Sequence, residues 1–313
     1  MIIEIHDVWH AASVKHEQYV RAKMEAAWKK LYRVGPPTPI LARVYAFIRK
    51  HETEIVCAST RSYISSVRDY DSQFPPGSGE RTMAEPILNR VFNYDKFRDA
   101  STGWRAYELC ASSPYRVCPY CHLVPTDTKK KEADNKGYRP QLDHFIAKAE
   151  YPFLSLSLGN LVPSCGDCNG PAMKHNVHVL TNPHLFPLAD TAVLTFKLRP
   201  REGKPWSPLL KALRLPLDEY EILIDTPSGN VAAQNSLQTF QLSDRYQNYL
   251  HEAYRIAKMD KNPAWLRTIA TKLGFHLSLD DQLGFPIEDK GTKFKNIPQG
   301  KMRLDVYVDS RKW

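Results

Sequence analysis

The sequence has no apolar run that approaches the length of a membrane span. A transmembrane helix needs about 18 or more consecutive apolar residues, and the 313-residue chain contains no such stretch. The first ten residues, MIIEIHDVWH, carry Glu4 and Asp7 where a signal peptide has an uninterrupted apolar core. We therefore expect no membrane partner and a cytoplasmic location.

Cysteine is also scarce, with six residues in the whole chain. In a reducing cytoplasm these are not expected to form disulfides. Four of them form two C-x-x-C pairs, at 118–121 and 165–168, whereas Cys57 and Cys110 stand alone. This grouping predicts a metal site for the four paired cysteines. The two single cysteines are expected to be small buried apolar side chains.

Acidic residues are outnumbered, which gives a formal net charge of +9 and a pI of about 9.1. Such a surface attracts polyanions, of which nucleic acid is the most common. A mildly basic protein of another kind has the same charge, so this observation does not decide the function. The sequence also has no internal repeat and no long low-complexity tract.

The N-terminal third is predicted to be helical. Apolar residues recur at helical spacing over three segments, at 10–34, 40–57 and 85–100. The proline-rich stretch GPPTP ends the first helix, and Pro86 is expected in the first turn of the third. QFPPGSGE at 73–80 is predicted to be a loop.

The C-terminal part mixes strand and helix patterns. Three runs are predicted to be strands, AVLTFKL at 192–198, YEILIDT at 220–226 and LDVYV at 304–308. A helix is predicted at 243–260, with Ser243 as its N-cap.

Between these parts, Cys, His, Pro and Asn cluster and the aliphatic periodicity fades. Small metal-stapled units have this composition because the metal replaces part of the core. The polar stretch 128–137 is predicted to be an exposed hairpin tip or a mobile insertion. The predicted fold class is α+β, with a helical N-terminal region at 1–113, a central metal-stapled unit at 114–187 and a mixed α/β region at 188–313.

The spacing of the paired cysteines predicts a structural zinc site. Two residues between cysteines allow a tight turn to direct both thiolates at one ion, and two pairs supply the tetrahedral set that zinc prefers. The ligands would be Cys118, Cys121, Cys165 and Cys168. Iron or an iron–sulfur cluster is the alternative, although the compact multi-cysteine run of ferredoxins is missing. A redox C-x-x-C is less favoured, because no βαβ context is evident.

The stretch QLDHF at 141–145 contains two residues, Asp143 and His144, that suggest a catalytic site. Adjacent residues on an extended segment face opposite sides, so Asp143 can bind a hard cation while His144 faces a substrate. The carboxylate suits Mg²⁺ or Mn²⁺, and the histidine can take a proton from water. Asn169, which follows Cys168, offers an amide oxygen as a further ligand.

Plainer interpretations of the same residues stay open. Asp143 and His144 can be an ordinary surface pair, and His144 alone can be a structural histidine. Asn160 can be a helix or turn cap, as asparagine often is. His122, beside Cys121, is expected to be structural, because four sulfurs already complete a zinc site.

Taken together, the motif CPYC…LDHF…NLVPSC..CN..K resembles the zinc-bearing branch of the HNH endonucleases, over about residues 115–185. The resemblance implies a ββα-metal unit, in which a hairpin and a helix surround one divalent ion, and hydrolysis of DNA. By position, His144 would be the general base, and Asp143 and Asn169 would hold the catalytic Mg²⁺ or Mn²⁺. Asn160 would orient the loop that carries His144. Asn169 is a departure, because many members have histidine there.

Further roles follow less directly. Lys174 and Lys148 flank the motif and could contact phosphates, and His175 could do the same or replace a ligand. NPHLFPLAD and TFQLSDRY, downstream of the motif, more loosely resemble PtuB-like HNH effectors of Septu-type and retron-linked anti-phage systems. That resemblance implies a partner ATPase. The alternative function is a catalytically inactive, zinc-stapled subunit that binds nucleic acid or docks a protein.

Overall fold

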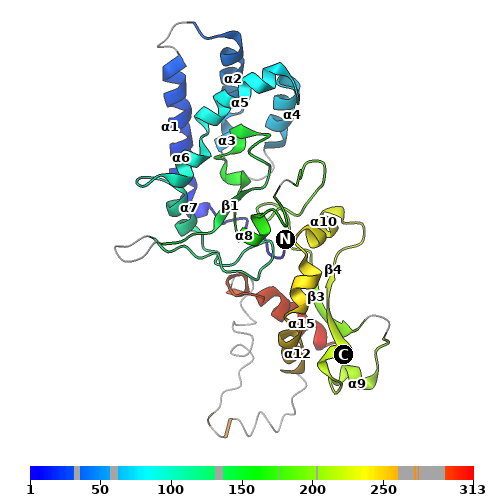
Figure 1. The fold of residues 1–313 in the computed structure, drawn as a ribbon. Coiled ribbons are helices and arrows are strands. Elements are labelled where there is room, and N and C mark those ends of the chain that lie inside the picture. The colour runs from blue at the N-terminus through cyan, green and yellow to red at the C-terminus, as the bar shows by residue number, and fades with distance from the viewer. Residues whose placement is uncertain are drawn as a thin grey trace.

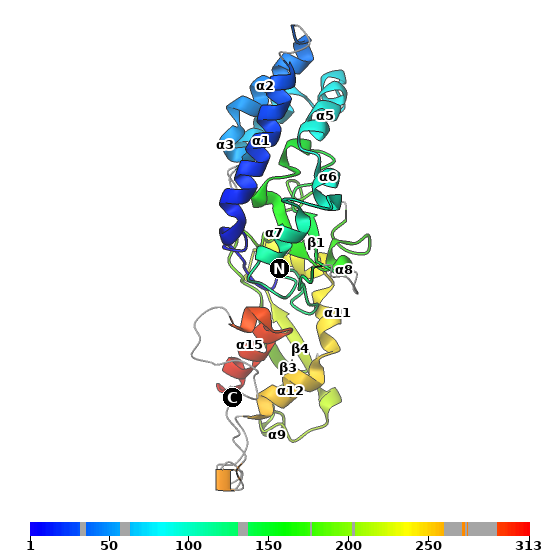
Figure 2. The same cartoon turned by 90° about the vertical axis from the view of Figure 1, so that its left-hand side faces the viewer.

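The computed structural model shows an α+β chain with many helices and two small antiparallel sheets. It describes residues 1–31, 36–56, 63–130, 137–175, 177–201, 204–259, 271–272, 274 and 293–313. Cys57 lies outside these ranges. The described parts form an elongated molecule (Figures 1 and 2), with the N-terminal helices at one end, β1 and α8 near the middle, and β3, β4 and α15 toward the other end.

The N-terminal region is helical, as predicted. Its elements are η1 (His10–Ala12), α1 (Ser13–Leu31), α2 (Pro39–Lys50), α3 (Glu52–Val56), α4 (Tyr63–Gln73), α5 (Gly79–Val91), α6 (Tyr94–Asp99) and α7 (Ala106–Ser112). The predicted second helix is interrupted at His51.

The third predicted helix is wrong in its bounds, because it is two helices, α5 and α6. Ser78 caps α5, with its hydroxyl oxygen accepting a hydrogen bond from the Arg81 N–H. This cap starts the helix six residues earlier than the apolar pattern indicates, so Pro86 lies inside α5 and not in its first turn. A second cap, Asn93, begins α6 by accepting from the Lys96 N–H.

Aromatic packing joins these helices to the central unit. The Phe153 ring, from η2 (Pro152–Leu154), lies 5.0 Å from the ring of Phe47 in α2 and 5.1 Å from the ring of Tyr70 in α4. The guanidinium of Arg81, in α5, donates to the Glu150 carbonyl at 2.7 Å. The helical region therefore supports the segment between the two strands of the central sheet.

The central sheet has two strands, β1 (Gln141–His144) and β2 (Leu161–Ser164). They pair antiparallel, with Asp143 opposite Val162 and His144 opposite Leu161. Two 3-10 turns, η2 and η3 (Leu158–Asn160), lie between them, and the single-turn helix α8 (Gly166–Asn169) follows β2. All four β2 residues are buried, so both faces of this strand are covered.

The second sheet confirms the strands predicted near 192–198 and 220–226. β3 (Thr195–Pro200) pairs antiparallel with β4 (Tyr220–Asp225). The other elements of this region are α9 (Pro208–Lys211), η4 (Leu217–Glu219), α10 (Val231–Thr239), α11 (Leu242–Gln247), α12 (Leu250–Met259), η5 (Lys293–Asn296) and α15 (Gly300–Ser310).

Two sequence predictions in this region are wrong. The stretch 304–308 is helical and belongs to α15, whose buried Met302 and Val306 are four residues apart on one helix face. Helix α15 packs against β3, and Asp305 accepts a hydrogen bond from the Phe196 N–H at 3.1 Å. The helix predicted at 243–260 is two helices, α11 and α12, and Ser243 is not an N-cap, because α11 begins at Leu242, after Gln241 in the left-handed conformation.

The first residues of the chain are part of the core. Met1, Ile2 and Ile3 are fully buried, and the Ile2 N–H donates to the Pro119 carbonyl at 2.9 Å. None of the described helices combines the length and the apolar content that crossing a bilayer requires.

Candidate functional site

The four paired cysteines come together in one buried cluster. Their sulfur atoms all lie within 4.8 Å of one another, and the Sγ atoms of Cys121 and Cys165 are 4.0 Å apart. Four sulfurs at about 2.3 Å from a tetrahedral zinc would be about 3.8 Å apart, so the set fits such an ion. Burial and the neighbouring cysteines raise the pKa of Cys118 well above its ordinary value. A bound cation would offset that cost by stabilising the thiolates.

Local turns aim each pair at the cluster. After the first pair, the His122 N–H donates to the Cys118 carbonyl at 2.8 Å. In the second pair, Cys165 caps α8, with its sulfur accepting from the Cys168 N–H at 3.5 Å. His122 itself is fully buried, its Nε2 lies 3.2 Å from the Lys295 carbonyl oxygen, and it is not among the clustered ligands.

Helix α11 covers the cysteine cluster. The Nη1 atom of Arg245 lies 3.4 Å from Cys168 Sγ, and the Tyr246 hydroxyl donates to the Cys121 carbonyl at 2.8 Å. Just before α11, the Phe240 ring stacks on Tyr120 with centroids 4.6 Å apart. These contacts were not predictable from the sequence. TFQLSDRY carries them, but no spacing rule connects it with Cys168, 77 residues before Arg245, or with Cys121, 125 residues before Tyr246.

Asp143 is held in a buried ion pair. Its Oδ1 accepts a hydrogen bond from Lys174 Nζ at 2.9 Å, and its Oδ2 accepts from the Tyr120 hydroxyl at 2.5 Å. Asp143 and Lys174 are each only 3% exposed. Burial and the Asp143 carboxylate raise the pKa of Tyr120 well above its ordinary value. The phenol therefore keeps its proton and serves as a donor.

His144 is fixed in one tautomer. Its Nε2 lies 2.9 Å from the Ser155 carbonyl oxygen, which can only accept, so Nε2 carries the proton and Nδ1 has a bare lone pair. Nδ1 makes no hydrogen bond to any residue that the structure describes. The Tyr94 ring, from α6, meets the imidazole edge-on at 4.5 Å. Burial lowers the pKa of His144 to about 4, so the ring is neutral at pH 7.

Asn160 ties the segment between the strands into a fixed loop. Its Oδ1 accepts from the Ile146 N–H at 2.7 Å, and its Nδ2 donates to the Ile146 carbonyl at 3.0 Å. Nδ2 also lies 3.3 Å from the Leu154 carbonyl oxygen. These bonds cross the loop and do not cap a helix. They hold the chain just before Ser155, whose carbonyl orients His144.

Asn169 contacts the start of β1. Its Nδ2 donates to Gln141 Oε1 at 2.8 Å, while its Oδ1 makes no hydrogen bond within the described chain. Gln141 and Asp143 are two residues apart and share one face of β1. The helix ends sharply at Gly170, where an added Cβ would lie 2.7 Å from the Gly166 carbonyl oxygen. A larger residue at this position would have to displace that carbonyl group.

The three predicted phosphate contacts lie in different settings. Lys174 is turned inward, because its ammonium also donates to the His144 carbonyl at 2.9 Å. Contact with a phosphate would require it to leave Asp143. Lys148 is at the surface, with Nζ 4.6 Å from the centre of the Tyr94 ring. His175, which follows Lys174, is exposed, and its backbone has a positive φ angle.

A groove of about 530 Å³ adjoins this site, between the α6–α7 region and the start of β1. It is lined by Arg98, Asp99, Ala100, Tyr107, Tyr138, Arg139, Pro140 and Gln141. The Arg139 guanidinium lies 5.6 Å from the centre of the Tyr107 ring, and Tyr138 is 57% exposed. Gln141, which contacts Asn169, connects the groove with α8. These residues form no motif, so the sequence alone does not indicate them.

Comparison of the chain with the models of known protein families, with curated proteins and with solved structures finds no match. The interpretation of the site therefore rests on its own geometry and on the motif in the sequence.

Proposed function

We propose that this chain is a metal-dependent HNH endonuclease, in which β1, β2 and α8 form the ββα unit and the four cysteines hold a structural zinc. The observation that carries the proposal is the state of His144. It is neutral, its Nε2–H is committed to Ser155, and its Nδ1 is left as a proton acceptor. A general base for water needs this combination.

The residues around His144 divide the proposed reaction between them. Nδ1 of His144 takes a proton from the attacking water, and Asn160 keeps the loop with Ser155 in place. Asp143 and Asn169 would hold a divalent ion, which when bound would neutralise charge on the phosphate and the leaving oxygen. Their oxygens are the donors that Mg²⁺ and Mn²⁺ prefer. Both carboxylate oxygens of Asp143 are engaged, so binding would displace Lys174 or Tyr120.

DNA is the proposed substrate. The net charge of +9 favours a polyanion, and the groove beside Gln141 presents arginine and tyrosine side chains. Arginine binds phosphate, and aromatic rings stack on bases. Arg98 is partly neutralised by Asp95 and Asp99, at 2.9 and 2.7 Å, so Arg139 is the stronger phosphate contact.

A second function has one specific observation in its favour. Because Asp143 is enclosed and paired with Lys174, the unit is also compatible with a zinc-stapled module that binds nucleic acid without cutting it. The ATPase partner and the role in anti-phage defence rest on the looser sequence resemblance and stay predictions.

Incubation of the zinc-loaded protein with supercoiled plasmid separates the two functions. The nuclease converts the plasmid to nicked or linear forms with Mg²⁺ or Mn²⁺, and EDTA stops the conversion. Asp143→Asn should abolish it without loss of zinc. The binding module instead shifts the plasmid on a gel in a salt-sensitive way and leaves it intact with every divalent ion.

A further inference from the structure

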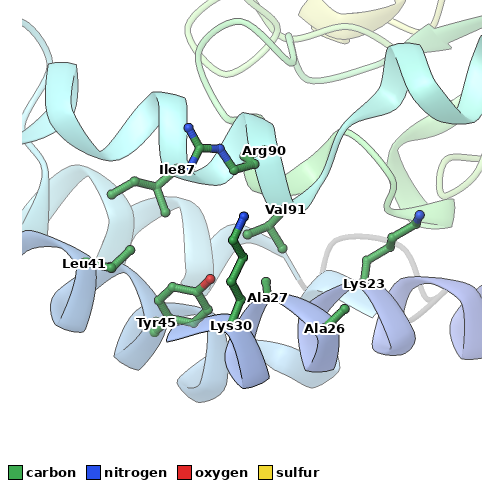
Figure 3. Close-up of a pocket in the computed structure, with 9 residues that line it drawn as sticks. All are labelled: Lys23, Ala26, Ala27, Lys30, Leu41, Tyr45, Ile87, Arg90 and Val91. Atoms are coloured by element: carbon green, nitrogen blue, oxygen red, sulfur yellow. The ribbon is translucent and has the colours of Figure 1, made fainter. Parts of the chain in front are cut away.

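A groove of about 470 Å³ lies among α1, α2 and α5 (Figure 3). It is lined by Lys23, Ala26, Ala27, Lys30, Leu41, Tyr45, Ile87, Arg90 and Val91. These helices stand at the end of the molecule away from β3 and β4, and none of the lining residues belongs to the hairpin site (Figure 1). The groove is therefore separate from the proposed nuclease centre.

The floor of the groove is apolar. Ala27 and Leu41 contribute from α1 and α2, and Ile87 and Val91 from α5. The small side chains of Ala26 and Ala27 keep the α1 side open, as Figure 3 shows. A volume of this size is within the range of sites that bind small organic molecules, at about 300–1,000 Å³.

The charged residues of the groove are all basic. Lys30, from α1, extends into the middle of the groove, Arg90 lies on α5 at the opposite side, and Lys23 lies toward one end (Figure 3). No acidic side chain is among the lining residues. Within the described chain, neither Lys30 nor Arg90 forms an ion pair. Like charges in one groove repel each other, so an anion placed between them would be stabilised.

Tyr45 contributes a hydroxyl group to the same groove. Its ring is buried against Trp28, with centroids 5.7 Å apart. Its hydroxyl points into the groove toward Lys30 (Figure 3), and it makes no hydrogen bond to a described residue. A phenol that keeps its proton can donate to an anion, and burial raises the pKa of Tyr45 above its ordinary value.

We propose that this groove binds a small amphipathic organic anion. Its apolar body lies on Leu41, Ile87 and Val91, and its carboxylate, sulfonate or phosphate group is held by Lys30, Arg90 and the Tyr45 hydroxyl. An apolar floor alone would accept any apolar molecule. The two basic side chains and the phenol that line the same groove favour a molecule with an acidic group.

The test uses two fluorescent probes that differ by the acidic group. 8-Anilinonaphthalene-1-sulfonate carries a sulfonate, and N-phenyl-1-naphthylamine has the same rings without it. Both are titrated into the full-length protein and into Lys30→Gln, Arg90→Gln, Tyr45→Phe and Leu41→Trp. Lys29→Gln is the matched control, because Lys29 is exposed on the same helix and does not line the groove. Circular dichroism establishes that each variant is folded.

We expect one saturable sulfonate site. Lys30→Gln and Arg90→Gln should each weaken it about tenfold, while Lys29→Gln leaves it unchanged. The neutral probe should bind the charge variants as it binds the wild type, and Leu41→Trp should exclude both probes. The proposal is overturned if the two charge variants bind the sulfonate as tightly as the wild type. It is also overturned if Lys29→Gln weakens binding equally. Arg90 is exposed, so its replacement does not threaten folding.

Discussion

The Nζ atom of Lys174 lies 2.9 Å from the Oδ1 atom of Asp143, across 31 residues of sequence. The pair joins the turn after α8 to β1, and both side chains are enclosed. In the proposed nuclease, Lys174 neutralises the carboxylate that would otherwise face a divalent ion. The ion pair should therefore stabilise the fold and compete with a divalent ion for the Asp143 carboxylate.

Lys174→Met should destabilise the protein by about 3–5 kcal/mol, because it leaves Asp143 buried and unpaired. Lys148→Met is the control. The Lys148 side chain is 40% exposed and pairs with Asp95 at 3.4 Å, so its loss should cost less than about 1 kcal/mol. Urea unfolding of the zinc-loaded proteins measures both values.

Mn²⁺ should raise the melting temperature of Lys174→Met more than that of the wild type, because the ion can take the place of the lost ammonium beside Asp143. The double variant Asp143→Asn, Lys174→Met should lose this response. An equal response of all three proteins would mean that Mn²⁺ binds elsewhere.

Arg245 should strengthen metal retention at the cysteine cluster, because its guanidinium lies 3.4 Å from Cys168 Sγ and offsets thiolate charge. We expect Arg245→Gln to release zinc to a chelator about tenfold faster or more, and Arg245→Lys to recover part of the loss. Cys118→Ser should lose the metal outright. Identical release by Arg245→Gln and the wild type would show that the contact does not act on the metal.

The cysteine cluster was predictable because its signal is local, whereas the pairing of β1 with β2 was expected only from the resemblance and from no strand pattern in the residues. Each C-x-x-C pair is contained in four consecutive residues, so its spacing alone indicates a shared metal site. The contacts of Lys174 with Asp143, Tyr94 with His144 and Arg245 with Cys168 were not predictable, because they join segments with no common pattern. The stretch 304–308 was predicted as a strand because five alternating residues do not distinguish a strand from a helix face.

His16 should make stability depend on pH between about 6.5 and 4. It is fully buried, its Nε2 lies 2.7 Å from the Leu156 carbonyl oxygen, and its Nδ1 accepts from Trp104 Nε1 at 3.1 Å. Protonating Nδ1 would break the second bond. Burial lowers the pKa of His16 from 6.5 to about 4, so below pH 6.5 the unfolded chain binds a proton that the folded chain does not.

The free energy of unfolding should therefore fall by about 1.4 kcal/mol per pH unit from this residue as pH drops from 6.5 to 4. Above pH 6.5 the contribution is complete and constant. Urea titrations of the wild type and His16→Gln at several pH values isolate the contribution of His16. His122 and His144 are present in both proteins, so their contributions cancel in the difference. A difference between the two proteins that stays constant over this window would contradict the assignment.

The most direct test of the proposed function is the single-turnover rate of DNA cleavage by His144→Ala beside the wild type and His10→Ala, which changes an exposed histidine. All three proteins are loaded with one zinc and supplied with Mg²⁺ or Mn²⁺. Loss of a general base should lower the rate of His144→Ala by a factor of about 10² or more, with His10→Ala unchanged. Cleavage by His144→Ala at the wild-type rate would contradict the account.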